Sequence, residues 1–237
     1  MDDESPLLGR GVLESVAALP ADAKAAVLIR HSTRGELVAP QDDVPLTPEG
    51  ILAARRFGRQ LRWPLSIAAR SSPRLRCRQS AEEILSGFSE THPGTQNSYL
   101  GSADSLSAII HGVSDHSLLQ QLFDGIQAGG GRDGRFRVPP PVVASSDRVA
   151  RESLARIAQL LRDSRSETLH VFVDHDLHLI ILREYIFGGR YRTTEWVDFL
   201  DGLVLSLTGE SLSVRMQGRT ATYGLRDGLN EGTDGPS

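Results

Sequence analysis

The chain has 237 residues, of which 39% are hydrophobic and 24% charged, and its formal net charge is −4. These values predict a folded, soluble protein, and they give no overall attraction to nucleic acid or to anionic membranes. The single cysteine, Cys77, excludes an intramolecular disulfide and a cysteine metal cluster. The acidic start does not resemble a signal peptide and no apolar run could span a bilayer, so we expect a cytoplasmic protein.

The first part of the chain alternates between helix and strand signals. In order, the apolar spacing predicts a helix over 7–19, a strand over 25–29, a helix over 47–61, a strand over 65–69 and a helix over 71–85. Thr47 is expected to cap its helix, with Pro48 at the first helical position. The third helix is expected to start at the turn Ser71-Ser72-Pro73.

The pattern weakens between residues 87 and 144. Only short helices are expected there, over 105–110 and 118–126. The glycine-rich run 129–135 predicts flexible chain, and Pro139-Pro140-Pro141 predicts a stiff, extended one. We interpret residues 87–144 as a small cap inserted over the site.

The last part returns to clear signals. In order, these predict a helix over 146–161, a strand over 169–173, a helix over 177–187 and three antiparallel strands over 202–207, 211–216 and 220–224. Residues 226–237 are rich in glycine and aspartate and predict a disordered tail. The whole chain is expected to form a single α/β domain, a three-layer sandwich with a mostly parallel central sheet and helices on both faces.

Three polar clusters are placed where chemistry is expected. Loops at the carboxyl edge of an open α/β sheet meet and bind ligands. The first cluster, Arg30-His31-Ser32-Thr33-Arg34, follows a strand. Arginines beside a histidine repel a metal cation, but they suit phosphate, because neutral imidazole can attack phosphorus while guanidinium groups hold its oxygens. The segment 71–79, with Arg76, offers hydroxyls and a helix start to an anion, and His175-Asp176 offers a second imidazole and a proton donor.

Four segments, in this order, resemble the histidine phosphatase superfamily, which includes phosphoglycerate mutases and acid phosphatases. Residues 28–32 resemble its Arg-His-Gly signature, and residues 45–50 resemble its Leu-Thr-x-x-Gly helix start. Residues 71–81 resemble its Ser-Ser-Pro-x-x-Arg-x-x-Gln-Thr-Ala segment, and residues 173–176 resemble its second-histidine motif. The ordered set is more specific than any one segment.

The resemblance implies a role for each matching residue. His31 would become phosphohistidine, and the transferred phosphoryl group would be held by Arg30, Arg34, Arg76 and His175. Arg34 matches an arginine that the acid phosphatase branch uses for phosphate. In the same branch the aspartate of His-Asp protonates the leaving group, so Asp176 is the candidate acid. This account requires neither a metal nor a cofactor.

Some assignments have alternatives. Ser32 stands where the family usually has glycine. Asp176 also suits a helix N-cap, and the mutase branch takes its acid, a glutamate, from the inserted region, where Asp104 and Asp115 are candidates together with the earlier Glu36. Packing or surface roles are expected for Arg74, Cys77, Arg78, His111, His116, His170, His178, Trp196 and Phe199. The last two could instead line an apolar wall of the site.

The sequence therefore predicts a metal-independent phosphatase that hydrolyses a small phosphorylated metabolite through phosphohistidine on His31. One alternative is a phosphotransferase similar to phosphoglycerate mutase. The other is a module that binds a phosphorylated ligand without catalysis. No nucleic-acid or membrane partner is expected.

Overall fold

A computed structural model of the chain describes residues 7–20, 22–36, 44–102, 140–165, 167–188 and 196–225. Its strands are β1 (Lys24–Arg30), β2 (Ser66–Ser71), β3 (Ser98–Ser102), β4 (Thr168–Asp174), β5 (Gly202–Thr208), β6 (Ser211–Met216) and β7 (Arg219–Gly224). Its helices are α1 (Arg10–Ala17), α2 (Pro48–Gln60), α3 (Leu75–Thr91), α6 (Pro140–Asp163) and α7 (Asp176–Phe187).

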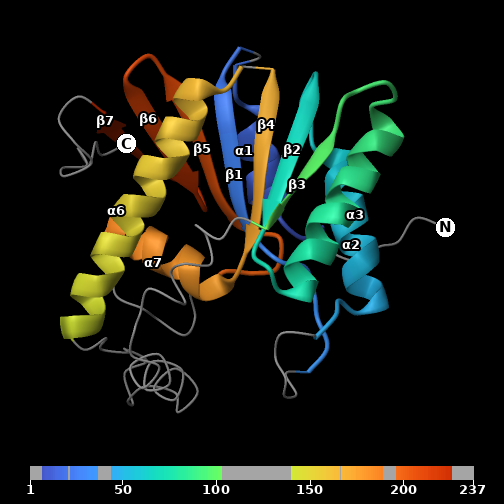
Figure 1. Ribbon diagram of the computed structural model, residues 1–237, viewed down its shortest axis with the longest axis horizontal. Helices are drawn as coiled ribbons and strands as arrows, with labels where there is room; N and C mark the ends of the chain where they lie inside the picture. Colours follow the sequence, from blue (N-terminus) through green and yellow to red (C-terminus); the bar gives the residue numbers. More distant parts are fainter. Residues whose placement is uncertain are drawn as a thin grey trace.

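All seven strands belong to one sheet, in the order β3-β2-β4-β1-β5-β6-β7 (Figure 1). The strands β3, β2, β4 and β1 are parallel, and β5, β6 and β7 continue the sheet in antiparallel pairs, as expected. Arg30 at the end of β1 pairs with Asp174 at the end of β4, and Ser71 of β2 pairs with Val173. This register brings the three segments that follow β1, β2 and β4 together at one edge of the sheet.

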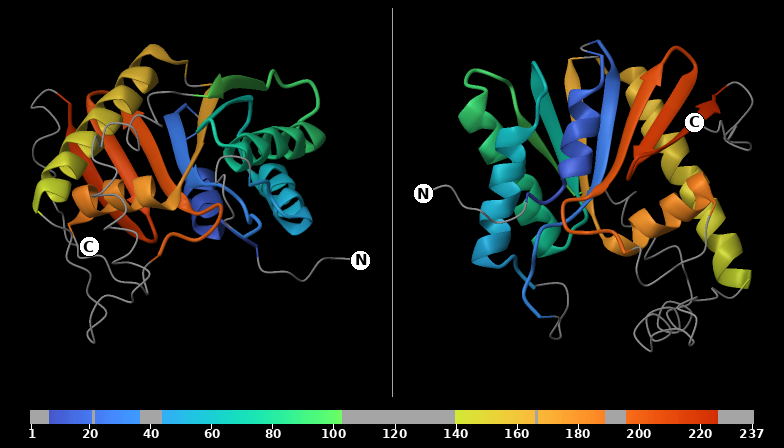
Figure 2. Two further views of the ribbon diagram at one scale, coloured as in Figure 1. Left: turned by 60° about the horizontal axis from the view of Figure 1, so that its bottom comes forward. Right: turned by 180° about the vertical axis from the view of Figure 1, so that it is seen from behind.

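Helices cover both faces of the sheet (Figures 1 and 2). Side chains of α1, α2 and α3 form one buried cluster with Val27 and Ile29 of β1. Side chains of α6 and α7 form a second cluster with Ala26 and Leu28. Successive residues of a strand point to opposite faces, so a strand buried on both faces is apolar throughout. The expected three-layer α/β sandwich is confirmed.

The start of α2 follows its sequence signal. Thr47 accepts a hydrogen bond at Oγ1 from the backbone N–H of Gly50, over 3.0 Å, and Pro48 is the first helical residue. Proline fits there because the first N–H groups of a helix have no partner within it.

The structure differs from the sequence predictions around the expected cap. The helix α3 starts at Leu75 and continues to Thr91, and β3 adds an edge strand at Ser98–Ser102, so the sheet and its helix extend past residue 87. The helix α6 starts at Pro140, although Pro140 and Pro141 were expected in an extended segment. The first turn of a helix tolerates proline. The rest of the expected cap, with Asp104 and Asp115, and the expected tail lie outside the described residues.

No helix in the described part of the chain combines the length and the apolar character needed to cross a bilayer.

Candidate active site

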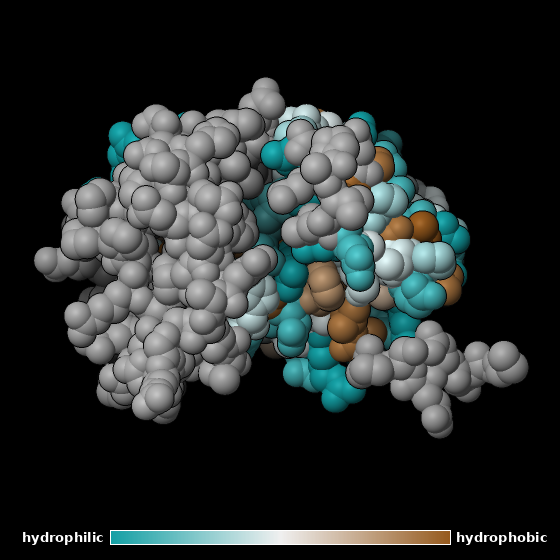
Figure 3. Space-filling view, turned by 90° about the horizontal axis from the view of Figure 1, so that it is seen from below, coloured by the Kyte–Doolittle hydropathy of each residue, from teal (hydrophilic) through white to brown (hydrophobic). Residues whose placement is uncertain are grey.

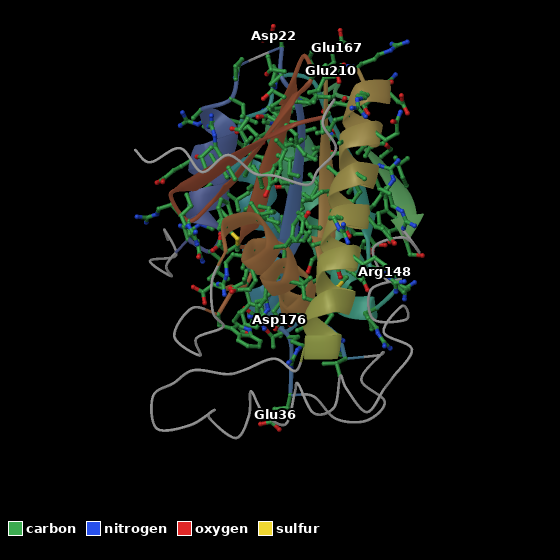
Figure 4. The ribbon with its side chains drawn as sticks, turned by 90° about the vertical axis from the view of Figure 1, so that its left-hand side faces the viewer. Asp22, Glu36, Arg148, Glu167, Asp176 and Glu210 are labelled. Carbon is green, nitrogen blue, oxygen red and sulfur yellow. The ribbon has the colours of Figure 1, made fainter. Side chains whose placement is uncertain are left out.

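The polar clusters lie at the end of the sheet where β1, β2 and β4 finish. Figure 4 shows Asp176 near this end, whereas Asp22 and Glu167, which precede β1 and β4, lie at the opposite end. Viewed from the end of Asp176, hydrophilic residues fill the strip of surface visible between two grey regions (Figure 3). This is the carboxyl edge, where open α/β sheets bind ligands.

His31 follows β1 directly and is held by its backbone and its ring. Its N–H donates to the carbonyl of Asp174 over 2.9 Å, and its Nδ1 lies 2.7 Å from the carbonyl oxygen of Ser32. Because a carbonyl only accepts, Nδ1 carries the hydrogen and Nε2 keeps its lone pair. Burial, together with the charges of Arg76 and Arg30, lowers the pKa of His31 to about 3. The imidazole is therefore neutral near pH 7.

Arg76 joins the two histidines of the predicted site. Its Nε donates to Nε2 of His31 over 3.3 Å, and its Nη2 donates to Nδ1 of His175 over 3.4 Å. The two imidazole rings meet edge to face, with centroids 5.5 Å apart. Arg76 is 9% exposed, and both histidines are buried. The structure thus brings together three residues from distant parts of the sequence, since Arg76 lies 45 positions after His31 and 99 positions before His175. The arginine has the fork geometry that suits an anion.

His175 is enclosed by polar groups from α3 and the loop before it. Its Nε2 lies 3.0 Å from Oγ of Ser72 and 3.7 Å from Sγ of Cys77. Since Nδ1 accepts from Arg76, Nε2 carries the hydrogen and donates to Ser72. Burial, with the charge of Arg76, lowers the pKa of His175 well below its usual value, and burial raises the pKa of Cys77. Cys77 is buried in the core as expected.

Arg30 is held on three sides. Its Nη1 donates to the carbonyl of Val197 over 2.8 Å, and its Nη2 forms an ion pair with Oδ2 of Asp176 at 2.9 Å. The guanidinium carbon lies 4.0 Å from the centroid of the Phe199 ring. Its Nε is buried and has no partner among the described residues. A buried donor without a partner is costly, so this N–H favours an anionic ligand.

Asp176 is the first residue of α7, and the N-cap position belongs to His175. Its Oδ1 accepts from the N–H of Leu177 over 2.8 Å, and its Oδ2 accepts from the indole of Trp196 over 3.1 Å besides contacting Arg30. The alternative interpretation of Asp176 as an N-cap is therefore wrong. Its carboxylate instead faces the arginine at the site.

Two aromatic residues, Phe199 and Trp196, contact residues of the site, whereas core packing was the main expectation for both and an apolar wall of the site was the alternative. Phe199 was expected to pack the sheet, but its ring lies against Arg30 and its centroid is 5.7 Å from that of His31. Trp196 packs against the core as expected, and its indole N–H also reaches Asp176. The sequence does not indicate these particular contacts, because both depend on how the segment before β5 folds back over the end of β1.

Ser32 has a definite place in the loop after His31. Its N–H donates to Oγ of Ser80 over 2.9 Å, and its own Oγ donates to the carbonyl of Gly50 over 2.7 Å. An added Cβ on Gly50 would collide with the carbonyl of Thr33. The loop is therefore pressed against the start of α2, and the hydroxyl of Ser32 fastens it there.

Arg34 lies at the outer side of the same loop, where its backbone forms an isolated bridge with Leu46. It is half-buried, and its charge interacts with those of Arg30 and Asp176. Glu36, one of the alternative acids, is exposed and lies well apart from Asp176 (Figure 4). Of the described candidates, only Asp176 places a carboxylate beside Arg30.

The donor groups of the site suit an anion. Within the ranges that the structure describes, no three His, Cys, Asp or Glu side chains gather in a way that could hold a metal ion. The site instead combines the guanidinium groups of Arg30, Arg34 and Arg76 with two neutral imidazoles. Such groups bind phosphate through charge-assisted hydrogen bonds.

The solved structures that are similar to this chain include the following three. A protein provisionally named as the phosphohistidine phosphatase SixA from Nakamurella multipartitia shares 23% identity, with 81% of this chain and 88% of that chain covered and a TM-score of 0.39. The phosphoglycerate mutase of Bacillus anthracis shares 14%, with 86% and 94% covered and a TM-score of 0.43. The phosphoserine phosphatase of Entamoeba histolytica shares 16%, with 89% and 95% covered and a TM-score of 0.43. At these values the three structures carry no argument about the substrate.

Comparison with families is more decisive than comparison with single proteins. No curated protein matches the chain. The family described as the histidine phosphatase superfamily (branch 1) matches residues 26–207, from the first strand of the sheet to its fifth. This range holds every residue of the site described above and most of the chain. The protein belongs to the histidine phosphatase superfamily.

Proposed function

We propose that the protein is a metal-independent phosphatase that hydrolyses a small phosphomonoester through a phosphohistidine intermediate on His31. One observation carries the proposal. Nδ1 of His31 is occupied by the carbonyl of Ser32 at 2.7 Å, so the lone pair on Nε2 faces the guanidinium of Arg76, 3.3 Å away. A neutral nucleophile beside a fixed cation suits attack on an anionic phosphoryl group.

In the first step, Nε2 of His31 attacks phosphorus, the N–P bond forms, and the bond to the leaving oxygen breaks. The phosphoryl oxygens take over the Nε–H of Arg76, which in the resting site donates to His31. Charge on these oxygens is offset by Arg30, Arg34, Arg76 and His175. His175 donates through the N–H that otherwise points to Ser72.

The leaving oxygen needs a proton, and Asp176 is the proposed donor. Its carboxylate lies on the same turn as His175 and contacts Arg30 through Oδ2 at 2.9 Å. A dianionic phosphoryl group competes for Arg30 and weakens this ion pair, which leaves the carboxyl group of Asp176 available to the leaving oxygen. In the second step a water molecule attacks phosphorus and gives a proton to Asp176. The N–P bond breaks, which releases inorganic phosphate and restores His31.

The proposal is tested by hydrolysis of p-nitrophenyl phosphate in the presence of EDTA. The parent is compared with His31→Ala and with His170→Ala, which removes another buried histidine of the same sheet. We expect activity in the parent and in His170→Ala, none in His31→Ala, and an acid-labile phosphoryl group on the quenched parent. Activity that persists in His31→Ala would show that the nucleophile is wrongly assigned.

The two alternatives give other results. A mutase moves the phosphoryl group within its substrate without releasing stoichiometric inorganic phosphate. A binding module shows no turnover, yet it binds inorganic phosphate or tungstate in calorimetry. Either result in the parent would replace the phosphatase proposal.

A further inference from the structure

A chain of three buried polar side chains lies behind His175, and the proposed reaction uses none of them. Oδ2 of Asp174 lies 2.6 Å from Nδ1 of His178, and Nε2 of His178 lies 3.3 Å from Oγ of Ser153. Asp174 is 1% exposed, His178 2% and Ser153 5%. Burial of a carboxylate costs free energy, and an apolar side chain would pack at this position without that cost. The presence of Asp174 with a hydrogen-bond partner on each oxygen therefore suggests a role beyond packing.

Asp174 contacts both histidines of the site. Its carbonyl accepts the backbone N–H of His31 over 2.9 Å, and its Oδ1 accepts the backbone N–H of His175 over 2.8 Å. A single residue at the end of β4 thus fixes the main chain of both histidines. Their separation depends on how firmly this residue is held.

His178 is what holds the side chain of Asp174. Because a carboxylate accepts, Nδ1 of His178 carries a hydrogen and donates to Oδ2. His178 lies four residues after Asp174, on the first turn of α7, and His175, the N-cap residue, makes no side-chain cap bond of its own. The Asp174 carboxylate therefore ties the first turn of α7 to the end of β4, with His175 between them.

The order serine, histidine, aspartate is also that of a hydrolase nucleophile and its base. Ser153, however, is buried on α6, and Oδ1 of Asp174 accepts a hydrogen bond from the backbone N–H of His175. A nucleophile needs an open approach for its substrate, so this chain does not form a second catalytic centre.

The geometry points to Asp174 and His178 as positioning residues that set the imidazole of His175 against Arg76 and His31. The expected effect on catalysis rests on the proposed function. The expected effect on the position of the His175 ring does not. The side-chain contacts of His175 are at 3.0 Å to Ser72 and 3.4 Å to Arg76, so a small displacement of its backbone breaks the alignment.

The first test measures hydrolysis of p-nitrophenyl phosphate by four variants. His178→Leu removes the donor to Asp174, whereas His178→Asn keeps an N–H near the position of Nδ1. Asp174→Asn keeps the shape of Asp174 and provides a second route if His178→Leu does not fold. His170→Leu is the matched control, because His170 is likewise buried and its ring likewise lies near a serine hydroxyl, Ser164 at 2.7 Å, although His170 is on β4 and His178 is on α7.

We expect kcat to fall about 10- to 100-fold in His178→Leu and Asp174→Asn, with KM within about twofold of the parent. His178→Asn should recover kcat to within about threefold of the parent, and His170→Leu should keep it. Equal kcat in the parent and in folded His178→Leu or Asp174→Asn would overturn the inference, as would equal losses in His178→Asn and His178→Leu.

The second test does not depend on activity. Imidazole ¹⁵N resonances of the histidines are recorded in the parent and the same variants. The resonances of His175 should shift in His178→Leu and Asp174→Asn and stay unchanged in His170→Leu. Unchanged His175 resonances in the first two would overturn the positioning role. If the parent lacks phosphatase activity, the proposed function fails while this spectrum still decides the inference.

Discussion

Nε of Arg76 donates to Nε2 of His31 over 3.3 Å, so the nitrogen proposed to attack phosphorus already has a cation beside it. Burial is the main reason that the pKa of His31 is low, and the positive charge of Arg76 lowers it further, so the nucleophile is unprotonated near pH 7. The contact with Arg76 also marks where a phosphoryl oxygen would lie once the hydrogen bond is exchanged for one to substrate. The resting site therefore suits the anion of the proposed reaction, and the predictions below concern its parts.

Catalysis should require both the positive charge of Arg76 and the two N–H groups that its guanidinium directs at His31 and His175. Arg76→Lys keeps the charge, but a single ammonium cannot face both His31 and His175 as the guanidinium does. We expect kcat/KM on p-nitrophenyl phosphate to fall about 100-fold or more in Arg76→Ala, with at most partial recovery in Arg76→Lys. Arg78→Lys, an exposed position on the same helix, is the control. Full activity in Arg76→Lys would contradict the need for the fork.

The free energy of unfolding should decrease as the pH is lowered through the range between the two pKa values of His31, in the unfolded and the folded protein. The pKa of His31 is about 3 in the folded protein against an ordinary 6.5, so the unfolded chain binds the proton first as pH falls. Between pH 6.5 and 3 the folded state therefore loses up to about 1.4 kcal/mol per pH unit from this residue. His175 and His170 act in the same direction.

The contribution of His31 is isolated by His31→Gln, which does not titrate. Urea unfolding at pH 7 and pH 4.5 should show a drop in the free energy of unfolding that is roughly 2 kcal/mol smaller in the variant than in the parent. An identical drop in both proteins would mean that His31 titrates normally in the folded state.

The role of Asp176 can be separated from its ion pair with Arg30 by the choice of leaving group. A general acid matters most when the leaving oxygen is basic. If Asp176 protonates the leaving oxygen, Asp176→Asn should lower kcat about 100-fold on an alkyl phosphate but only about tenfold on p-nitrophenyl phosphate. Glu36→Gln, at an exposed carboxylate, should leave both rates unchanged. Equal losses on both substrates would show that Asp176 only positions Arg30.

The fold and the core of the site could be predicted from the sequence because their signals are local. Alternating apolar runs indicated the layers, Thr47-Pro48 indicated the start of α2, and the polar residues after β1 and β4 indicated His31 and His175. Parallel strands then require their loops to meet, whatever the details of packing.

The remaining parts depend on contacts between distant segments. The strand β3 has few apolar residues, since an edge strand need not be buried on both faces, and α6 includes two prolines in its first turn. Phe199 and Trp196 approach Arg30 and Asp176 only through the fold of the segment before β5. The partners of Asp174 lie on α7 and beside it in the sheet, so its sequence neighbours do not reveal that it contacts both His31 and His175.

The loop that carries His31 should tolerate no side chain at Gly50. A Cβ there would overlap the carbonyl of Thr33, which is backbone and cannot rotate away, so the loop and the start of α2 must separate. That movement also breaks the hydrogen bond from Ser32 to the carbonyl of Gly50. We expect Gly50→Ala to lose about 1–3 kcal/mol of stability in urea unfolding and to lower kcat on p-nitrophenyl phosphate.

Gly35 provides the matched control in the same loop. A Cβ at Gly35 meets no atom within 4 Å, so Gly35→Ala should keep both stability and kcat.

Ser32→Gly removes the hydroxyl without adding bulk, and we expect a loss in stability of about 1 kcal/mol, the usual net value of one hydrogen bond. If Gly50→Ala matched Gly35→Ala in both measurements, the close contact between the loop and α2 would not hold His31 in place.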